Sequence, residues 1–173
     1  MKTLIIIDML NGFCREGFPL SLPNYNPNIE TYIKNRIEKF LKNNDKVIFM
    51  YDNHSHSDPE INNPFPPHCM QGTIEAEIVD TLAPYKEKAI ILPKHTTSII
   101  YQTGLENILQ ELNPDEIEIV GVCTDICDLF AVYELRIRGY KVTVSKQGVL
   151  PLDQSRQQFF LSYFEKVLGA KIQ

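Results

Sequence analysis

The sequence predicts an α/β protein: a three-layer α-β-α sandwich around a mostly parallel, doubly wound sheet of about six strands. Short apolar runs alternate along the chain with amphipathic stretches. The first four runs are apolar nearly throughout, which is typical of strands that are covered on both faces. Strands joined by helices pair in parallel through right-handed crossovers. Because the chain has 173 residues, we expect a single domain over residues 1–173.

Each strand and helix is expected at a particular stretch. The strand candidates are "TLIIIDM" (3–9), "KVIFMYD" (46–52), "AIILPK" (89–94), "EIEIVGV" (116–122), "KVTVSK" (141–146) and the closing "AKIQ" (170–173). The helix candidates are 29–41, 73–82, 104–112, 126–138 and 154–168. In the first helix candidate, apolar residues recur with a period near 3.6. In the last, one buried face is predicted, with Asp153 as a candidate cap; its members are Phe159, Phe160, Tyr163, Phe164 and Val167.

Composition excludes several classes of protein. Hydrophobic residues make up 43% and charged residues 23%, and the net charge of -5 leaves no basic footprint for nucleic acid. No segment reaches the roughly 20 apolar residues of a membrane span. Asp8 interrupts the apolar start, and no small-residue cleavage site follows it, so a signal peptide is not expected. Four cysteines are too sparse for a disulfide scaffold, which favours a cytoplasmic location.

One long region lacks helical or strand periodicity. Residues 53–72 contain four prolines and three of the four histidines of the chain. A loop this long in a compact domain is usually functional or disordered. The histidines favour a functional loop.

Reactive side chains follow four of the predicted strands. Asp8, Asp52 with His54, Lys94, and Cys127 stand at or just past the ends of successive strands. In a parallel sheet these ends share one edge, where ligands bind. Taken singly, an Asp there is usually a turn residue, a Lys a surface charge and a Cys a small buried hydrophobe. The prediction of a site therefore rests on their convergence.

These groups predict nucleophilic chemistry. Cys127 is placed at the start of a helix, where backbone N–H groups and Lys94 favour a thiolate. Asp8 is suited to accept the thiol proton and return it to a leaving group. Asp125 and Asp128 flank Cys127, and they would raise the pKa of its thiol if they pointed at the sulfur.

The loop also predicts a metal site. Mixed Asp and His ligation with open positions suits Zn, Fe or Mn better than Ca or Mg. The candidates are Asp52, His54, His56, Glu60 and His68.

Three segments resemble the isochorismatase-like cysteine hydrolases over essentially the whole chain. "IIIDMLNGF" resembles the opening strand with the catalytic Asp, here Asp8. "LPKHTTSIIYQTGLENIL" resembles the segment of the catalytic lysine, here Lys94. "VGVCTDICDLFAVYELRIRGYKV" resembles the nucleophile segment, here Cys127. The resemblance implies backbone N–H groups of Cys123 and Cys127 as an oxyanion hole, with a cis peptide bond before Cys123.

Within that family, the loop resembles the metal-binding stretch of the nicotinamidases. The resemblance implies Asp52, His54 and His68 as ligands of one divalent transition metal, with zinc as the first choice and iron or manganese as alternatives. Glu60 is the expected fourth ligand, and His56 competes with it. The three aromatic residues expected to pack the substrate ring are Phe13, Phe65 and Tyr101.

The implied reaction is hydrolysis of nicotinamide to nicotinate and ammonia through a Cys127 thioester, in NAD salvage. One alternative is an amidase for another small amide or carbamoyl compound, because Leu10, Gly12 and Asp128 depart from the usual family pattern. Another is a catalytically silent metal or thiol module on the same fold. Neither nucleic acid nor a membrane is expected as a partner. A homo-oligomer is possible, although the sequence identifies no apolar stripe as an interface.

Overall fold

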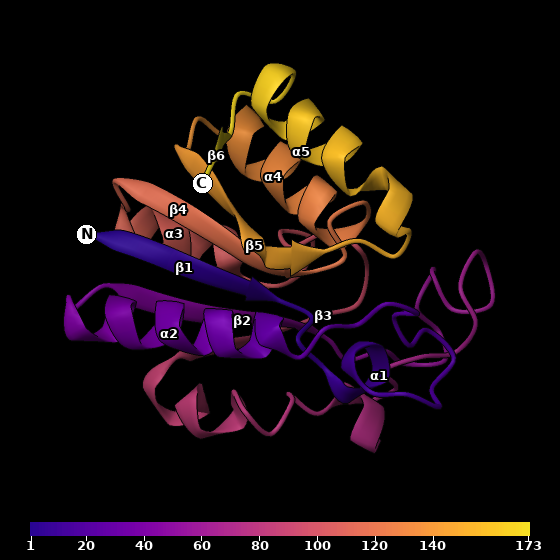
Figure 1. Cartoon of the computed structure of the whole chain (residues 1–173). Helices are drawn as coiled ribbons and strands as arrows, with labels where there is room; N and C mark the ends of the chain where they lie inside the picture. The colour runs from indigo at the N-terminus through magenta and orange to yellow at the C-terminus, as the bar shows by residue number, and fades with distance from the viewer.

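The computed structural model describes residues 1–173 and contains a six-stranded parallel sheet between two layers of helices (Figure 1). The strands are β1 (Lys2–Ile7), β2 (Lys46–Asp52), β3 (Ile90–Lys94), β4 (Glu116–Val122), β5 (Val142–Leu150) and β6 (Lys171–Ile172). Their order is β3-β2-β1-β4-β5-β6, and every neighbouring pair is parallel. This confirms the predicted α/β sandwich. The order reverses between β1 and β4, which is where such sheets bind ligands.

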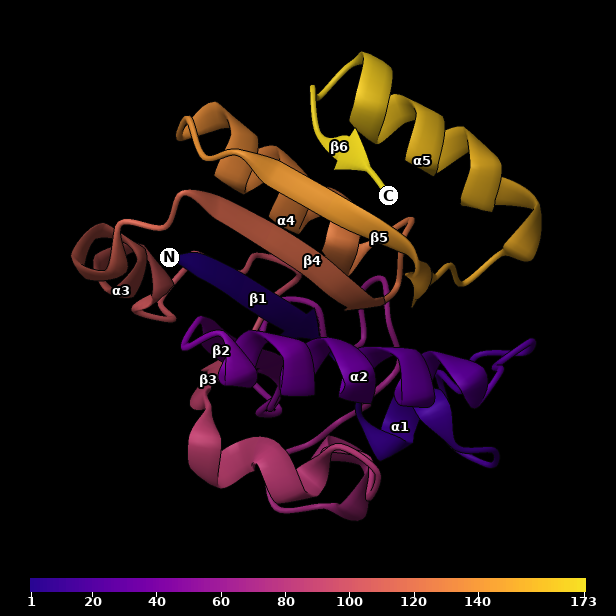
Figure 2. The same ribbon diagram turned by 60° about the vertical axis from the view of Figure 1, so that its left-hand side comes forward.

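Helices cover both faces of the sheet. The α-helices are α1 (Asn11–Cys14), α2 (Asn28–Lys42), α3 (Leu105–Leu112), α4 (Cys127–Ile137) and α5 (Gln157–Lys166). Shorter 3-10 turns span Ile74–Ala76, Ala83–Lys88 and Gln154–Arg156. Helix α2 covers one face, and α3, α4 and α5 cover the other (Figure 2). None of these helices has the length and apolar character needed to cross a membrane.

The central strand β1 shows why its apolar run is uninterrupted. Leu4 and Ile6 belong to the core beneath α2, whereas Ile5 and Ile7 belong to the core beneath α3 to α5. All four side chains are fully buried, so alternation between two covered faces leaves no polar position. The third apolar run, which forms β3, is less buried. Strand β3 lies at the edge of the sheet, and residues 90–93 are only half-buried.

The helix predicted over 73–82 is wrong. Only Ile74–Ala76 forms a short 3-10 turn, and Ile78 makes an antiparallel bridge with Leu10. The Val79 amide donates to Met9 O over 3.0 Å. The backbone of this segment therefore finds its hydrogen bonds in the chain that follows β1, which holds it extended.

The predicted buried face of 154–168 is also only partly right. Helix α5 starts at Gln157, and Asp153 accepts a hydrogen bond from Ser155 N in the preceding 3-10 turn. Phe164 is fully buried and Phe160 is half-buried. The other three predicted members are exposed: Phe159, Tyr163 and Val167. Because α5 is an outer helix near the β5–β6 edge of the sheet (Figure 1), it buries only a narrow stripe.

Candidate active site and metal group

Asp8 is held between the first two strands. Its amide donates to Met50 O, and its Oδ1 accepts from Asp52 N, both over 2.9 Å. Its φ of 51° is unusual for a residue other than glycine. On the other side of β1, Gly121 is in register with Ile7 and has a φ of 132°. A Cβ on Gly121 would lie 2.0 Å from Ile7 O, so only glycine allows this close approach of β1 and β4.

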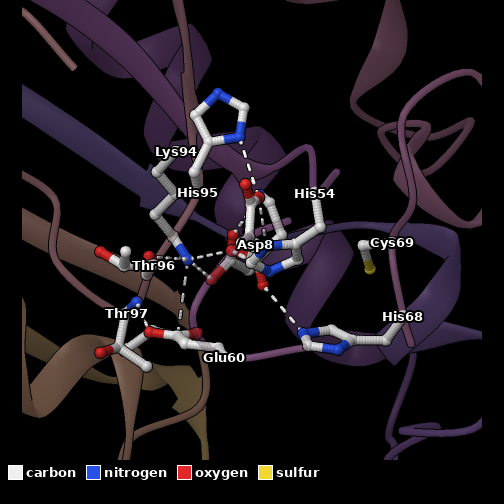
Figure 3. A network of polar contacts seen from close by, with 12 residues as sticks. Asp8, His54, Glu60, His68, Cys69, Lys94, His95, Thr96 and Thr97 are labelled. Carbon is white, nitrogen blue, oxygen red and sulfur yellow. Dashed lines mark hydrogen bonds and ion pairs between the residues drawn. The ribbon is translucent and has the colours of Figure 1, made fainter. Parts of the chain in front are cut away.

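Lys94 joins the reactive groups at the end of the sheet (Figure 3). Its side chain is completely buried. The ammonium lies 2.8 Å from Asp8 Oδ2 and 3.7 Å from Cys127 Sγ, and it also donates to Asp52 Oδ1. We call Asp8, Lys94 and Cys127 the proton-transfer group. The structure brings these three predicted residues together around one buried cation.

Burial and opposite charge set the protonation of this group. Burial and the negative charge of Asp52 raise the pKa of Asp8 to about 6, although Lys94 acts in the opposite direction. Burial alone would lower the pKa of Lys94, but Asp52 and Asp8 raise it well above its ordinary value. Asp8 therefore titrates closer to neutrality than a free aspartate, which suits a residue that takes up and releases a proton.

The thiol of Cys127 differs from the expectation of a stabilised thiolate. Burial raises its pKa well above the ordinary value; the charge of Lys94 lowers this pKa, and the charges of Asp8 and Asp52 raise it. The flanking acid Asp128 acts instead on the pKa of Cys123. Cys127 is therefore a neutral thiol at rest, and its sulfur lies 3.7 Å from the ammonium of Lys94. A neutral thiol can act as a nucleophile only where a neighbouring base takes its proton.

Two backbone amides at this site have no acceptor in the protein. The amides of Ile126 and Asp128 both donate to Cys123 O, whereas those of Cys123 and Cys127 donate to nothing within the chain. The Val122–Cys123 peptide bond is cis, as the resemblance implied. Free amides beside a thiol are the donors that an oxyanion requires.

The metal group consists of Asp52, His54 and His68, whose candidate ligand atoms all lie within 4.8 Å of one another. His68 Nδ1 lies 2.8 Å from Pro66 O, and His54 Nδ1 lies 3.1 Å from Asp58 Oδ2. Each contact directs the Nε2 atom of its ring toward the centre of the group, as in known metal sites. His54 Nε2 is buried and has no hydrogen-bond partner. The donors present therefore fit a divalent transition metal.

Glu60 and His56, the two candidates for the fourth ligand, lie in different parts of the loop region. Glu60 lines the cavity beside Asp52 and His68, and its carboxylate accepts a hydrogen bond from Thr97 N. It is not one of the three residues whose ligand atoms already lie together. His56 is exposed on the outer part of the loop.

One cavity opens onto both groups. Cys127, Asp52 and His68 line it, and the rings of Phe13 and Phe65 pack against His68 at centroid distances of 5.8 and 5.9 Å. The lining residues that sequence reasoning missed are Leu20, Thr97, Val122, Ile126 and Leu152.

Tyr101 is not brought to the cavity. Its side chain is 58% exposed and does not line the cavity wall. Its amide donates to Ser98 Oγ in the turn that follows β3. The turn therefore directs Tyr101 outward, and its predicted packing against the substrate ring stays a prediction.

Asp128 is a buried carboxyl without a partner. It is fully buried, and neither of its side-chain oxygens has a hydrogen-bond partner. Burial raises its pKa well above the ordinary value, and the negative charges of Asp8 and Asp125 act in the same direction. The carboxyl of Asp128 therefore gives up its proton less readily than a free aspartate does.

Similar proteins agree with this fold and site. The sequence matches the isochorismatase domain family over residues 2–172. It is 32% identical to the isochorismatase family protein PncA of Bacillus subtilis over 180 residues, covering 99% of this chain and 98% of that protein. The structure of a pyrazinamidase/nicotinamidase from Streptococcus mutans superposes with a TM-score of 0.93 at 29% identity, covering 100% of both chains. A pyrazinamidase of Pyrococcus horikoshii in complex with zinc has a TM-score of 0.88 at 25% identity, covering 99% of this chain and 98% of that one.

Fold and comparisons together define a hydrolytic amidase of the cysteine type. The chain belongs to the isochorismatase family, and nicotinamidases are among its structural neighbours.

Proposed function

We propose that this chain is a metal-dependent amidase that hydrolyses nicotinamide to nicotinate and ammonia, in the salvage of NAD. One observation carries the proposal. A single cavity is lined by a cysteine paired with an acid and a lysine, by two members of a metal group, and by two aromatic rings. An aromatic amide with a ring nitrogen would present its amide carbonyl to the cysteine, its ring nitrogen to the metal group and its ring to the two aromatic side chains.

The proposed reaction follows from the contacts of the proton-transfer group. Cys127 Sγ attacks the amide carbonyl carbon while its proton passes to Asp8. The amides of Cys123 and Cys127 hold the oxyanion. The C–N bond then breaks, and the amide nitrogen leaves as ammonia with the proton from Asp8. Water, deprotonated by Asp8, cleaves the thioester, which releases the carboxylate and returns the proton to Cys127. Lys94 stabilises Asp8 whenever it is a carboxylate.

The metal group is assigned to orientation of the substrate. Asp52, His54 and His68 would hold the metal, and Glu60 is the fourth ligand in this proposal because it lies at the cavity and His56 does not. Zinc is the first choice, with iron or manganese as alternatives. When bound, the metal supplies a Lewis-acid contact for a ring nitrogen. Phe13 and Phe65 would pack the faces and edges of the ring.

Release of ammonia from nicotinamide tests the proposal. Metal-loaded wild type is expected to turn over nicotinamide, Cys127→Ala to be inactive, and the matched variant Cys123→Ala to remain active, since only the amide of Cys123 takes part. A strong chelator should abolish turnover, and added zinc, manganese or iron should restore it. Failure of the metal-loaded wild type to release ammonia from nicotinamide would refute the proposed substrate. Turnover of another small amide or a carbamoyl compound would then identify the alternative amidase, whereas no turnover at all would indicate a silent module.

A further inference from the structure

A buried carboxylate joins the two ends of the loop between α1 and α2. We call residues 15–25 the α1–α2 loop; Figure 2 shows it leaving α1 and returning toward the start of α2. Glu30, in the first turn of α2, is only 4% exposed. Its Oε1 accepts one hydrogen bond from Arg15 Nη1 and another from Tyr25 Oη, each over 2.6 Å, and Arg15 Nη2 lies 3.4 Å from its Oε2. Because Arg15 and Tyr25 are the first and last residues of the loop, Glu30 closes it.

Glu30 carries its negative charge at neutral pH. Burial opposes its ionisation, but the hydrogen bonds from Arg15 and Tyr25 lower the pKa of Glu30 below its ordinary value. Hydrogen bonds to a carboxylate are roughly twice as strong as those between neutral groups. A carboxylate in the first turn of a helix also offsets the helix dipole, but an exposed side chain would do this equally well. The burial of Glu30 therefore needs a reason beyond α2, and its contacts with the α1–α2 loop supply one.

Few other polar contacts hold the loop to the rest of the chain. Among residues 16–24, only the amide of Leu22 donates a backbone hydrogen bond outside this range, to Phe13 O over 2.9 Å. Phe18 and Ser21 bond to one another within the loop, since Ser21 Oγ accepts from Phe18 N over 2.9 Å and Ser21 N donates to Phe18 O over 3.2 Å. The contacts at the two ends of the loop are therefore a large share of the polar contacts that fix it in place.

The loop forms part of the wall of the cavity. The side chain of Leu20 lines the cavity, and so does that of Phe13, whose carbonyl holds Leu22. The ring of Phe13 packs edge-on against that of His68 at 5.8 Å. No hydrogen bond or ion pair joins the loop to the proton-transfer group. Displacement of the loop would therefore change the apolar wall, against which a ring would bind, and leave the reacting groups in place.

We propose that Glu30 is a positioning residue: it holds the α1–α2 loop against the cavity and thereby sets the affinity for the substrate, without acting in the chemical step. The inference rests on the proposed function, because it assigns this cavity to a small aromatic amide. When only a fraction of the molecules has the binding site formed, the apparent affinity falls by that fraction. A variant with a loosened loop should therefore raise KM and leave kcat unchanged, since the bound complex is the same.

Tyr25→Phe and Tyr85→Phe form a matched pair for the test. Both tyrosines donate to a glutamate of α2, Tyr25 to Glu30 over 2.6 Å and Tyr85 to Glu38 over 2.5 Å, but only Tyr25 belongs to the loop. In the metal-loaded protein with nicotinamide as the substrate, Tyr25→Phe should raise KM by about 10-fold, the effect of one hydrogen bond to a charged group, with kcat near that of the wild type. Tyr85→Phe should leave both constants unchanged. Circular dichroism checks that each variant is folded.

A second pair of variants separates the hydrogen bonds from the shape of the side chain. Glu30→Leu removes both acceptor oxygens and should raise KM more than Tyr25→Phe does. Glu30→Gln keeps an oxygen that can accept from Arg15 and Tyr25, so its KM should lie closer to that of the wild type. Hydrogen exchange of the Leu22 amide, measured by NMR without substrate, reports on the loop itself. Exchange should be faster in Tyr25→Phe and Glu30→Leu than in the wild type, and unchanged in Tyr85→Phe.

The outcomes separate this inference from the proposed substrate. Wild-type KM in both Tyr25→Phe and Glu30→Leu would overturn the inference, whether or not exchange at Leu22 is faster. A lower kcat at unchanged KM would place Glu30 in the chemical step and would overturn it as well. Absence of ammonia release from nicotinamide by the wild type would refute the proposed substrate. The exchange measurement would then decide whether Glu30 holds the loop, since it needs no substrate: faster exchange in Tyr25→Phe but not in Tyr85→Phe supports that role, and equal exchange refutes it.

Discussion

The proton-transfer group and the metal group meet at Asp52 but balance their charges in opposite ways. In the proton-transfer group, the cation comes from the protein itself, because Lys94 forms ion pairs with the carboxylates of Asp8 and Asp52. In the metal group, Asp52, His54 and His68 turn metal-ligating atoms toward a common centre. The one cation near them is the ammonium of Lys94, which belongs to the proton-transfer group. The first group is prepared by the chain itself, whereas the second has the donor set of a metal site.

The two groups also differ in how they are built. Parallel register places Asp52 directly opposite Lys94 on adjacent strands. The metal group depends on the loop instead, because a bridge between His54 and Met70 joins its two ends and brings His54 within 4.7 Å of the ring of His68. Residues placed by strand register keep their relative positions when a nearby loop changes. Residues placed by a loop depend on the contacts within that loop.

The largest expected effect separates chemistry from metal binding. Asp8→Asn should lower the rate of amide hydrolysis by about 10²–10⁴-fold, because an amide cannot take the proton of Cys127. Metal content, measured by elemental analysis after dialysis, should stay at the wild-type level. Loss of metal together with activity would show that the two groups are one unit.

Removal of the shared cation should destabilise the fold. Lys94→Met leaves Asp8 and Asp52 as buried carboxylates without their partner, which is expected to lower the free energy of unfolding by about 3–5 kcal/mol. Urea unfolding of the metal-free protein measures this change. Lys42→Met, at an exposed lysine, is the control and should change little. Equal stability of the two variants would mean that Lys94 does not balance the buried charges.

A variant outside the metal group should weaken metal binding alone. Asp58 contacts His54 Nδ1 at 3.1 Å and directs the opposite nitrogen of that ring. Asp58→Ala should therefore weaken zinc affinity by about 10–100-fold, measured by competition with a chromogenic chelator. At saturating zinc, the rate of amide hydrolysis should return to near that of the wild type. A rate that stays low at saturating zinc would place Asp58 in the chemistry.

The smallest expected effect concerns a carboxyl that neither group neutralises. Asp128→Val should raise the free energy of unfolding at pH 7 by about 1–3 kcal/mol, because it removes a buried group without a partner. The pKa of Asp128 is raised in the folded state, so above pH ~4 the unfolded chain releases a proton that the folded chain keeps. The wild type therefore loses stability as the pH rises through this range.

The valine variant has no such proton, so its advantage should be smallest below pH ~4 and should grow toward neutrality. Urea unfolding at several pH values measures the difference. A valine variant that is less stable than the wild type at pH 7 would show that Asp128 has a favourable partner in solution.

Sequence alone was enough to predict the sheet and the rim of the site. Apolar runs mark the strands, and in a parallel sheet their carboxyl ends share one edge, so Asp8, Lys94 and Cys127 had to lie near one another wherever the helices packed. The strand order and the contacts of Lys94 agree with that expectation. Chain direction and hydrophobic pattern are local properties, so they can be taken directly from the sequence.

Tertiary structure alone decided where individual side chains point and which apolar residues are covered. Asp128 adjoins Cys127 in sequence, yet its carboxyl acts on the pKa of Cys123. Tyr101 follows the lysine segment but is turned outward. The apolar residues of α5 predicted a buried face, and Phe159 is 64% exposed. Sequence spacing shows which residues share a face of a helix, but burial depends on what packs against that face, and here only the assembled sheet determines it.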